Sequence, residues 1–364
     1  MVQGGISPKP DQGTAEKEKI NTLTGCLFIL SLIPCQGGGD FFKKAEENLV
    51  RVLRYFYIQA MMQRKYLITL AGPTAVGKTQ VAIEIAKHFH TEIINADSRQ
   101  VYREMKIGTA VPSSGQLEAV PHHFIGSRSI QEYYNASMFE QDAVALLARL
   151  FVLHDLVIMS GGSGMYMDAV CSGIDDFPAV NALIREKLKS DFQQKGMDWL
   201  RSRIKESDPD YYGQVDLNNP KRLLKALEII TMTSRPYSSY LTRKKKEREF
   251  SIIPVGLNVE RTALYRNINR RVDTMITQGL VSEVTALLPF RHFNALNTVG
   301  YKEIFDHLDG KTSLEEAIDL IKGHSRQYAR RQITWFRKNS DIRWFAPEEL
   351  SAIIKFAEEK MQSE

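Results

Sequence analysis

Long apolar runs, cysteine pairs and internal repeats are all missing from this 364-residue chain. No apolar stretch reaches the roughly 20 residues that a helix needs to cross a bilayer, so we expect a protein with no membrane span. The three cysteines, Cys26, Cys35 and Cys171, form no CxxC pair and no metal-ligand spacing, which fits a reducing, cytoplasmic compartment. His122 and His123 lack a third ligand at useful spacing, and we interpret them as structural.

The overall charge of the chain excludes little. The formal charge is +5 and the pI is near 8.9, so the chain is mildly basic, which permits a nucleic-acid partner without requiring one. A hydrophobic content of 43% and a charged content of 25% are ordinary for a globular protein. The chain is long enough for one large core or two domains, and the distribution of its charges has to indicate the partner.

Residues 1–64 differ in composition from the rest of the chain. The first part is polar and without periodicity, which predicts disorder. The short apolar run Leu23–Cys35 resembles the core of a signal peptide but lies far from Met1. We expect an N-terminal extension, either disordered or upstream of a true start at Met61 or Met62, and we assign it no catalytic role.

The strongest signal in the sequence is a phosphate-binding loop. It consists of Gly72, Pro73, Thr74, Ala75, Val76, Gly77, Lys78 and Thr79. The segment follows a predicted strand, Tyr66–Ala71, and leads into a helical pattern, which completes the P-loop signature. Its glycines allow backbone N–H groups to converge on an anion. Lys78 supplies a charge for the terminal phosphate oxygens, and the hydroxyl of Thr79 is placed to bind Mg²⁺.

Polar residues also follow two further predicted strands. Glu92–Asn95 leads to Asp97, and Leu156–Ser160 leads through two glycines to Ser163. In an open parallel sheet the carboxyl ends of the strands form the ligand crevice, so we expect Asp97 and Ser163 at the phosphate site. No carboxylate follows Leu156–Ser160, which weakens the case for a nucleotide-hydrolysing switch or motor.

A charged helical block interrupts the strands and predicts an insertion. The predicted fold is α/β, with a P-loop NTPase-like parallel sheet core and a helical insertion domain. Its parts are the core at 65–175 and 251–346, the insertion at 176–250 with helices near 180–194, 199–207 and 221–233, and a C-terminal tail at 347–364.

Basic residues concentrate away from the P-loop. Lys221, Arg222 and Lys225 share one side of a predicted helix, a basic run covers 243–248, and the predicted helix 325–337 is rich in arginine. Such surfaces suit a phosphate backbone. The residues leave three classes open: a small-molecule kinase, a transferase with a diphosphate leaving group and an RNA acceptor, and a non-enzymatic nucleotide-gated RNA-binding module.

Eight motifs together resemble one family, the tRNA dimethylallyltransferases, in order and spacing over about residues 65–346. The motifs are Gly72–Thr79, Asp97–Tyr102, Ile107–Ala110, Pro121–His123, Gly161–Tyr166, Asn219–Leu223, Val299–Tyr301 and Arg326–Gln332. The resemblance implies transfer of a dimethylallyl group from dimethylallyl diphosphate to N6 of the adenosine at position 37, next to the anticodon, in tRNAs that read codons beginning with U. It implies a magnesium-dependent cytoplasmic enzyme, which we expect to be a monomer.

The resemblance also implies roles for single residues. The catalytic residues would be Asp97 as general base, Lys78, Thr79 as the magnesium ligand, and Ser163 in the channel where base and donor meet. The diphosphate would be held by residues 72–79 and by Arg261. The anticodon stem-loop would contact Asp97, Ser98, Arg99, Gln100, Ser163, Arg185, Lys221, Arg222, Leu223, Leu224 and Lys225. The chain departs from the family at Asn267, where arginine is usual and Arg266 lies one position early, and at Lys225, where arginine is common.

Overall fold

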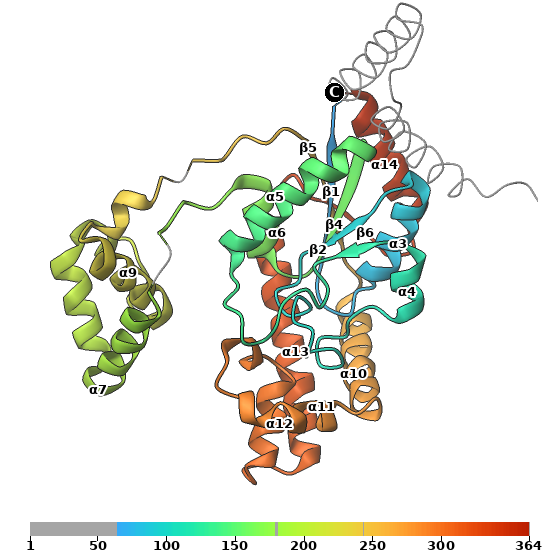
Figure 1. Ribbon diagram of the computed structural model, residues 1–364. Helices are drawn as coiled ribbons and strands as arrows, with labels where there is room; N and C mark the ends of the chain where they lie inside the picture. The colour runs from blue at the N-terminus through green and yellow to red at the C-terminus, as the bar shows by residue number, and fades with distance from the viewer. Residues whose placement is uncertain (1–63, 179–180, 243, 364) are drawn as a thin grey trace, which may run out of the picture. The chain divides into compact units, whose positions relative to one another are not determined.

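A parallel β-sheet forms the centre of the protein, as the sequence predicted. The computed structural model describes residues 64–178, 181–242 and 244–363, so the predictions about residues 1–63 lie outside the described residues. The sheet has six strands in the order β3-β2-β4-β1-β5-β6 (Figure 1), and each neighbouring pair is parallel. The strands are β1 (Tyr66–Ala71), β2 (Ile93–Asn95), β3 (His122–His123), β4 (Leu156–Ser160), β5 (Ser251–Leu257) and β6 (Arg343–Phe345).

The central strands β1 and β4 are buried along their whole length because helices cover both faces of the sheet. Every residue of β1 is buried, and its side chains alternate between two hydrophobic clusters. Leu67 and Ala71 join the cluster of α5 (Ala136–Leu153) and α6 (Gly164–Ser172). The remaining helices of the core are α3 (Lys78–Phe89), α4 (Ser114–Ala119), α10 (Arg261–Thr277), α11 (Leu280–Ala286), α12 (Tyr301–Leu308), α13 (Leu314–Phe336) and α14 (Leu350–Ser363), with short 3-10 helices at Leu288–Phe290 and Asn294–Leu296. A third 3-10 helix, Tyr237–Tyr240, belongs to the helical block.

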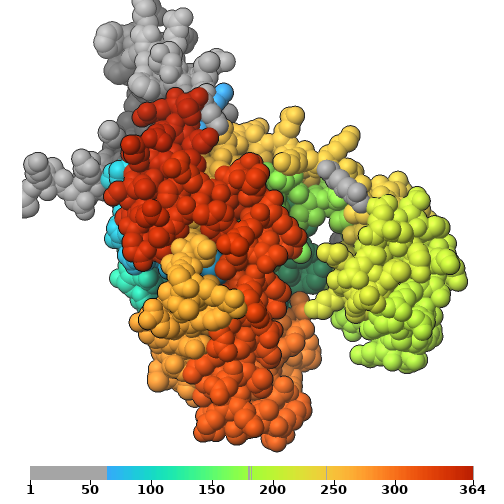
Figure 2. Space-filling model, turned by 180° about the vertical axis from the view of Figure 1, so that it is seen from behind, coloured from blue at the N-terminus to red at the C-terminus, as the bar shows by residue number. Residues whose placement is uncertain are grey.

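The C-terminal segments are more ordered than the sequence indicated. The prediction that residues 347–364 form a tail is wrong, because α14 buries Ile353, Phe356 and Ala357 in the cluster that contains Ile68 and Leu70 of β1. Helix α13 also begins well before the predicted 325–337, at a capping box formed with Ser313. Figure 2 shows the orange and red C-terminal segments covering the face of the core seen from behind.

The helical block has a small hydrophobic cluster of its own. Its helices are α7 (Ala182–Ser207), α8 (Pro209–Tyr212) and α9 (Pro220–Thr233). The two helices predicted at 180–194 and 199–207 form one span with non-helical backbone at Gly196, where φ is 75°. Leu200, Ile204, Leu223 and Leu227 pack together in this cluster. No helix in the described part of the chain is long and apolar enough to cross a membrane.

Candidate functional site

Two cavities adjoin at the carboxyl ends of the central strands. The first, about 550 Å³, is the P-loop pocket, lined by residues that include Lys78, Thr79 and the Gly161–Gly162 turn. The second, about 490 Å³, is the α12 pocket, lined by residues that include Asn297–Glu303 and several basic side chains. The residues that line both are Thr74, Ala75, Asp97, Arg271 and Tyr328. These five residues therefore form the boundary across which a ligand in one cavity meets a ligand in the other.

The P-loop has the backbone conformation that its sequence predicts. A Cβ added to Gly72 would lie 2.7 Å from the carbonyl oxygen of Leu257, so only glycine fits there. Gly77, with φ 103°, precedes α3, whose N-terminus has no side-chain cap and is free to receive an anion. Lys78 Nζ donates to the carbonyl oxygens of Gly72, at 2.9 Å, and Pro73, at 2.7 Å.

Two half-buried cations, Lys78 and Arg271, carry much of the positive charge of the P-loop pocket. Burial, together with the nearby Arg271 guanidinium, lowers the pKa of Lys78 to about 7, against a smaller opposing effect of Asp97. Burial also lowers the pKa of Arg271, whose Nη2 donates to the carbonyl oxygen of Thr109 at 3.0 Å. An anion bound between these two groups would relieve their repulsion, so the pocket suits a multiply charged anion.

Asp97 is fixed by one oxygen and open at the other. Its Oδ1 accepts hydrogen bonds from the backbone N–H groups of Arg99, at 2.8 Å, and Gln100, at 3.3 Å. A Cβ built on Gly162 would lie 3.9 Å from Oδ2, so this oxygen faces the turn that lines the P-loop pocket. No described residue donates a hydrogen bond to Oδ2. The carboxylate is thus oriented by the backbone while one oxygen stays available to a substrate.

Ser163 and Tyr328 form a polar wall beside Asp97. Ser163 Oγ accepts from the backbone N–H of Ser98 at 2.9 Å and donates to Ser98 Oγ at 3.1 Å. The Tyr328 hydroxyl lies within hydrogen-bonding reach of the Ser163 side chain, and burial followed by the nearby Asp97 charge raises the pKa of Tyr328. The phenol is therefore neutral and available as a hydrogen-bond donor at the boundary of the two pockets.

Gln332 joins the P-loop to the turn after β4. It was not among the predicted site residues. Its Oε1 accepts from Thr74 N–H and its Nε2 donates to the carbonyl oxygen of Gly162, both at 2.8 Å. The side chain is 5% exposed. A Cβ on Gly162 would lie 2.3 Å from Gln332 Nε2, so the contact requires glycine. The one signal in the sequence is the four-residue spacing from Tyr328, which places both on one face of α13.

Glu283 holds the loop that supports Arg271. Its carboxylate accepts from the backbone N–H groups of Lys106 (3.0 Å), Ile107 (2.7 Å) and Gly108 (3.0 Å), and from the Tyr301 hydroxyl (2.7 Å). The next residue in this loop presents the carbonyl oxygen that Arg271 uses. The predicted motif Ile107–Ala110 is therefore a support for the site.

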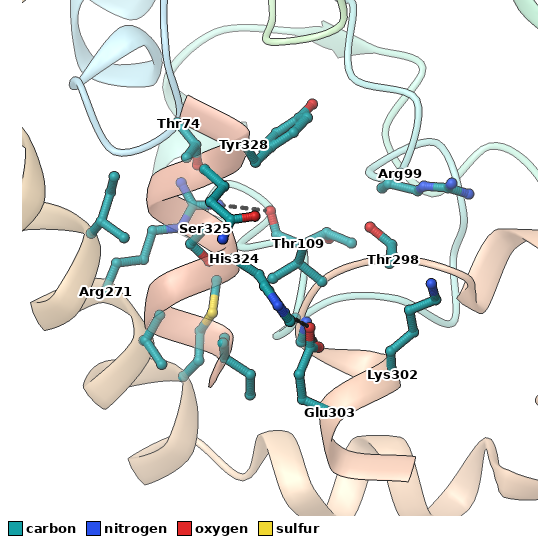
Figure 3. Close-up of a pocket in the computed structure, with 18 of the residues that line it drawn as sticks. Thr74, Arg99, Thr109, Arg271, Thr298, Lys302, Glu303, His324, Ser325 and Tyr328 are labelled. Carbon is teal, nitrogen blue, oxygen red and sulfur yellow. Dashed lines mark hydrogen bonds and ion pairs between the residues drawn. The ribbon is translucent and has the colours of Figure 1, made fainter. Parts of the chain in front are cut away.

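The α12 pocket is lined by several basic side chains. Figure 3 shows Arg99, Lys302 and Arg271 on different sides of the cavity, with His324 and Glu303 at its lower end. His324 Nδ1 lies 2.6 Å from Glu303 Oε1, and the other oxygen of Glu303 accepts from the backbone N–H of Gly300 at 2.7 Å. Because Glu303 is committed to these partners, the lysine and arginine side chains dominate the remaining surface and suit an anionic ligand.

Two residues predicted to contact RNA, Arg99 and Gln100, are half-buried and hydrogen-bond to backbone carbonyl oxygens. Arg99 Nη1 donates to the carbonyl oxygens of Asn294, at 3.1 Å, and Ala295, at 3.0 Å. Gln100 Nε2 donates to the carbonyl oxygens of Thr109 and Ala110, both at 3.0 Å. These two side chains brace the walls of the pockets.

The insertion presents only part of its predicted RNA-binding set. Leu223 is fully buried in the cluster of the insertion, so its side chain is not available to RNA. Leu224 packs against the same cluster. Arg185 is paired with Glu228, at 3.1 Å, and bonded to a tyrosine hydroxyl. Lys221, which also lines the α12 pocket, and Arg222 are exposed. Lys225 is half-buried, with its ammonium group 5.9 Å from the centre of the Phe177 ring.

Helix α10 contributes a different arginine from the one expected. Arg261 is exposed at the first turn, its Nε donates to the Tyr265 hydroxyl at 3.1 Å, and it lines neither pocket. Arg271, Arg270 and Asn267 of the same helix line the P-loop pocket, and Arg266 does not. Arg271 was not among the predicted site residues, although its four-residue spacing from Asn267 puts both positions on one helix face.

The remaining candidates do not form a metal cluster. His122 and His123 line neither pocket, and His123 Nε2 lies 2.6 Å from Glu92. Among the described residues, no group of three or more His, Cys, Asp or Glu side chains could hold a metal ion. A metal at the P-loop would therefore depend on the Thr79 hydroxyl and on oxygens of the ligand.

The fold and the site define a P-loop α/β protein in which an anion cradle adjoins a second, basic pocket across a single aspartate. A family model described as IPP transferase matches residues 100–339, and the chain belongs to the IPP transferase family. It is similar to tRNA dimethylallyltransferase 1 of Bacteroides thetaiotaomicron, at 49% identity over 80% of this chain and 94% of the relative. It is also similar to tRNA dimethylallyltransferase of Christiangramia forsetii, at 49% identity over 82% of this chain and 99% of the relative.

Solved structures support the same assignment. The full-length tRNA isopentenylpyrophosphate transferase of Bacillus halodurans superposes with a TM-score of 0.61 at 34% identity, over 82% of this chain and 97% of that one. A eukaryotic dimethylallyltransferase acting on tRNA gives a TM-score of 0.67 at 26% identity, over 81% and 77%. The resemblance found in the sequence motifs and the predicted P-loop α/β class are confirmed. The kinase and RNA-binding-module alternatives gain no support from these relatives.

Proposed function

We propose that this protein is a tRNA dimethylallyltransferase. It transfers the dimethylallyl group of dimethylallyl diphosphate to N6 of the adenosine at position 37, next to the anticodon, in tRNAs that read codons beginning with U, and it releases diphosphate. The observation that carries the proposal is the position of Asp97 on the boundary between the P-loop pocket and the basic α12 pocket. A base placed there serves a reaction between a diphosphate ester on one side and an RNA base on the other.

The donor diphosphate occupies the P-loop pocket. Lys78, Arg271 and the free N–H groups at the start of α3 surround it. Breaking the bond between the allylic carbon and the diphosphate oxygen leaves the electron pair on that oxygen. Fixed positive groups that face this oxygen stabilise the departing charge more than the ground state, which lowers the barrier. Binding the anion also restores the proton on Lys78, whose pKa in the free protein is about 7.

The acceptor adenine enters from the α12 pocket after leaving its stack in the anticodon loop. Its N6 attacks the allylic carbon, the new C–N bond forms as the C–O bond breaks, and the N6 proton passes to Asp97 Oδ2. The Oδ1 contacts to Arg99 and Gln100 N–H keep the carboxylate turned toward the reacting nitrogen. Ser163 and Tyr328 line the passage as neutral hydrogen-bonding groups.

The site suits a magnesium ion that is bound mainly by oxygens of the substrate. Mg²⁺ is commonly held by one or two protein oxygens together with phosphate oxygens and water, and Thr79 offers such a hydroxyl in the P-loop pocket. When bound, the ion neutralises charge on the diphosphate leaving group. The lack of an acidic cluster among the described residues is compatible with this arrangement.

The tRNA is held by basic side chains of two regions. Lys302 and Arg331 line the α12 pocket, and Lys221, Arg222 and Lys225 project from α9. Ser98 and Arg99 line the α12 pocket, through which the adenine enters. We also propose that Arg261, which lines neither pocket, contacts the diphosphate from outside the P-loop pocket. We propose a cytoplasmic enzyme that acts as a monomer.

The test is a mass measurement. The full chain is incubated with Mg²⁺, dimethylallyl diphosphate and unmodified tRNA, and the digested tRNA is examined for an adenosine that has gained one dimethylallyl group. We expect this product without ATP, and its loss in Asp97→Asn. ATP turnover with a small acceptor, and no modified adenosine, would overturn the proposal in favour of a kinase.

A further inference from the structure

Asn95 is a buried amide at the floor of the P-loop pocket. It is the last residue of β2 and lies opposite Ser160 of β4, which in turn lies opposite Leu70 of β1. Asn95 is 8% exposed and Ser160 is 7% exposed, and both line the pocket together with Lys78. The amide therefore sits two strands away from the strand that carries the P-loop, at the same edge of the sheet.

This amide differs from every other amide side chain that lines the pocket. The others all bond within the protein: Gln80 with Glu84, Gln100 with the carbonyls of Thr109 and Ala110, Gln116 with Ser113, Asn267 with Arg270, and Gln332 with Thr74 and Gly162. Asn95 Nδ2 is buried and has no hydrogen-bond partner among the described residues. An unsatisfied buried donor is unfavourable and calls for a partner.

The surrounding charges indicate what that partner is. The pocket contains the cations Lys78, Arg270 and Arg271, and Asp97 is its one acidic side chain among the described residues. The strand next to β1 ends in Ser160 with no carboxylate beyond it, at the edge where P-loop nucleotide hydrolases place an aspartate for the metal. A neutral N–H donor beside cations suits an oxygen that carries negative charge or that belongs to a metal-bound water.

We propose that the Asn95 side-chain amide donates a hydrogen bond to the magnesium diphosphate group bound in the P-loop pocket. The partner oxygen belongs either to a phosphate or to a water molecule on the metal, and both take the same N–H donor. The terminal torsion of asparagine is broad, so the amide turns toward the ligand at low cost. This inference rests on the proposed function, because it places the diphosphate in this pocket.

The experiment measures binding of inorganic diphosphate to the full-length protein by calorimetry, with and without Mg²⁺. Asn95→Leu keeps the approximate volume and removes the donor, and we expect it to weaken binding by about 10- to 100-fold. Asn95→Asp replaces the donor with a negative charge, and we expect a larger loss. A loss in both conditions identifies a phosphate oxygen as the partner, and a loss only with Mg²⁺ identifies a metal-bound water.

Asn258 supplies a matched control. It follows β5 at the same edge of the sheet, its Oδ1 is also buried without a partner among the described residues, and it lines neither the P-loop pocket nor the α12 pocket. We expect Asn258→Leu to bind diphosphate like the wild type. Thermal unfolding without ligand separates the two roles of the amide: Asn95→Leu should be as stable as the wild type or more so, because it removes an unpaired buried donor.

Two results would overturn different statements. Binding by Asn95→Leu and Asn95→Asp within twofold of the wild type, with and without Mg²⁺, would overturn the role of Asn95 alone. Wild-type binding that is insensitive to Lys78→Met would place the diphosphate elsewhere and overturn the proposed function itself.

Discussion

The P-loop pocket and the helical insertion both carry positive charge, but they hold it in different ways. In the pocket, Lys78 and Arg271 are half-buried and held by hydrogen bonds to backbone carbonyl oxygens, and burial lowers the pKa of both. On α9 the basic side chains of Lys221 and Arg222 are exposed, and the half-buried Arg185 of α7 is paired with Glu228. Fixed, desolvated charges suit one small anion at a defined place. Exposed, flexible charges suit a long polyanion whose binding depends on salt.

The largest effect should come from the aspartate between the two pockets. Asp97→Ala removes the general base, and we expect turnover to fall by about 10²- to 10⁴-fold while tRNA and diphosphate both still bind. Single-turnover rates and separate binding measurements check this. Unchanged turnover in Asp97→Ala would show that Asp97 is not the general base. Its role would then be to hold the backbone of Arg99 and Gln100.

The buried charge of Lys78 should make donor binding depend on pH. Its pKa in the free protein is about 7, so above this pH the lysine is neutral and must take up a proton when the anion binds. We expect affinity for dimethylallyl diphosphate to fall by about tenfold per pH unit above pH 7, while the terminal phosphate, with a pKa near ~6, stays ionised. Calorimetry in buffers of different ionisation enthalpy measures the uptake. The slope should flatten in Lys78→Met, and an equally steep slope in that variant would rule out this lysine as its source.

Gln332 should affect the rate more than binding. Gln332→Met breaks both hydrogen bonds that join Thr74 to Gly162, so we expect the P-loop to shift relative to Asp97 and kcat to fall by about tenfold. Diphosphate affinity should change less, because Lys78 and Arg271 are untouched. The exposed Gln194→Met on α7 is the control. A loss of diphosphate affinity as large as the loss in kcat would show that Gln332 supports binding and not alignment.

The smallest effects should come from the surface of the insertion. Lys221→Ala and Arg222→Ala should each weaken tRNA binding by about three- to tenfold and reduce the slope of affinity against salt by about one. Lys189, an exposed lysine paired with Glu186 on α7, is the control. Filter binding at several salt concentrations measures both quantities. A change in donor KM with unchanged tRNA affinity would show that the insertion surface does not bind tRNA and would contradict the difference drawn between the two regions.

Sequence reasoning succeeded where local pattern decides structure. The bounds of β1 and β4 agree with the predicted ranges because each short apolar run ends at a glycine-containing turn. It missed β3 and β6, which have two and three residues and too few positions to show a period. It also predicted a tail where α14 packs on the sheet.

The site was predicted in its local motif and missed in its long-range contacts. The P-loop and Asp97 follow directly from strand ends. The contact between Thr74 and Gln332 joins residues 258 positions apart, and that between Arg271 and Thr109 joins residues 162 apart. Neither spacing carries a signal, because only the packing of α10 and α13 brings these side chains to the strand ends. Leu223 was misassigned for a similar reason, since a basic neighbourhood does not reveal that one side chain points into a core.

The hydrogen bonds of Lys78 to the carbonyl oxygens of Gly72 and Pro73 have a consequence for the end of each catalytic cycle. When diphosphate departs, the Lys78 amino group returns to these two carbonyl oxygens, which hold it whether or not it keeps its proton. Product release then exchanges one set of bonds for another and does not strand a bare charge in the interior. The same exchange runs in reverse when the next donor molecule arrives. Between turnovers, the carbonyl oxygens of the loop take the place of the diphosphate as partners of Lys78.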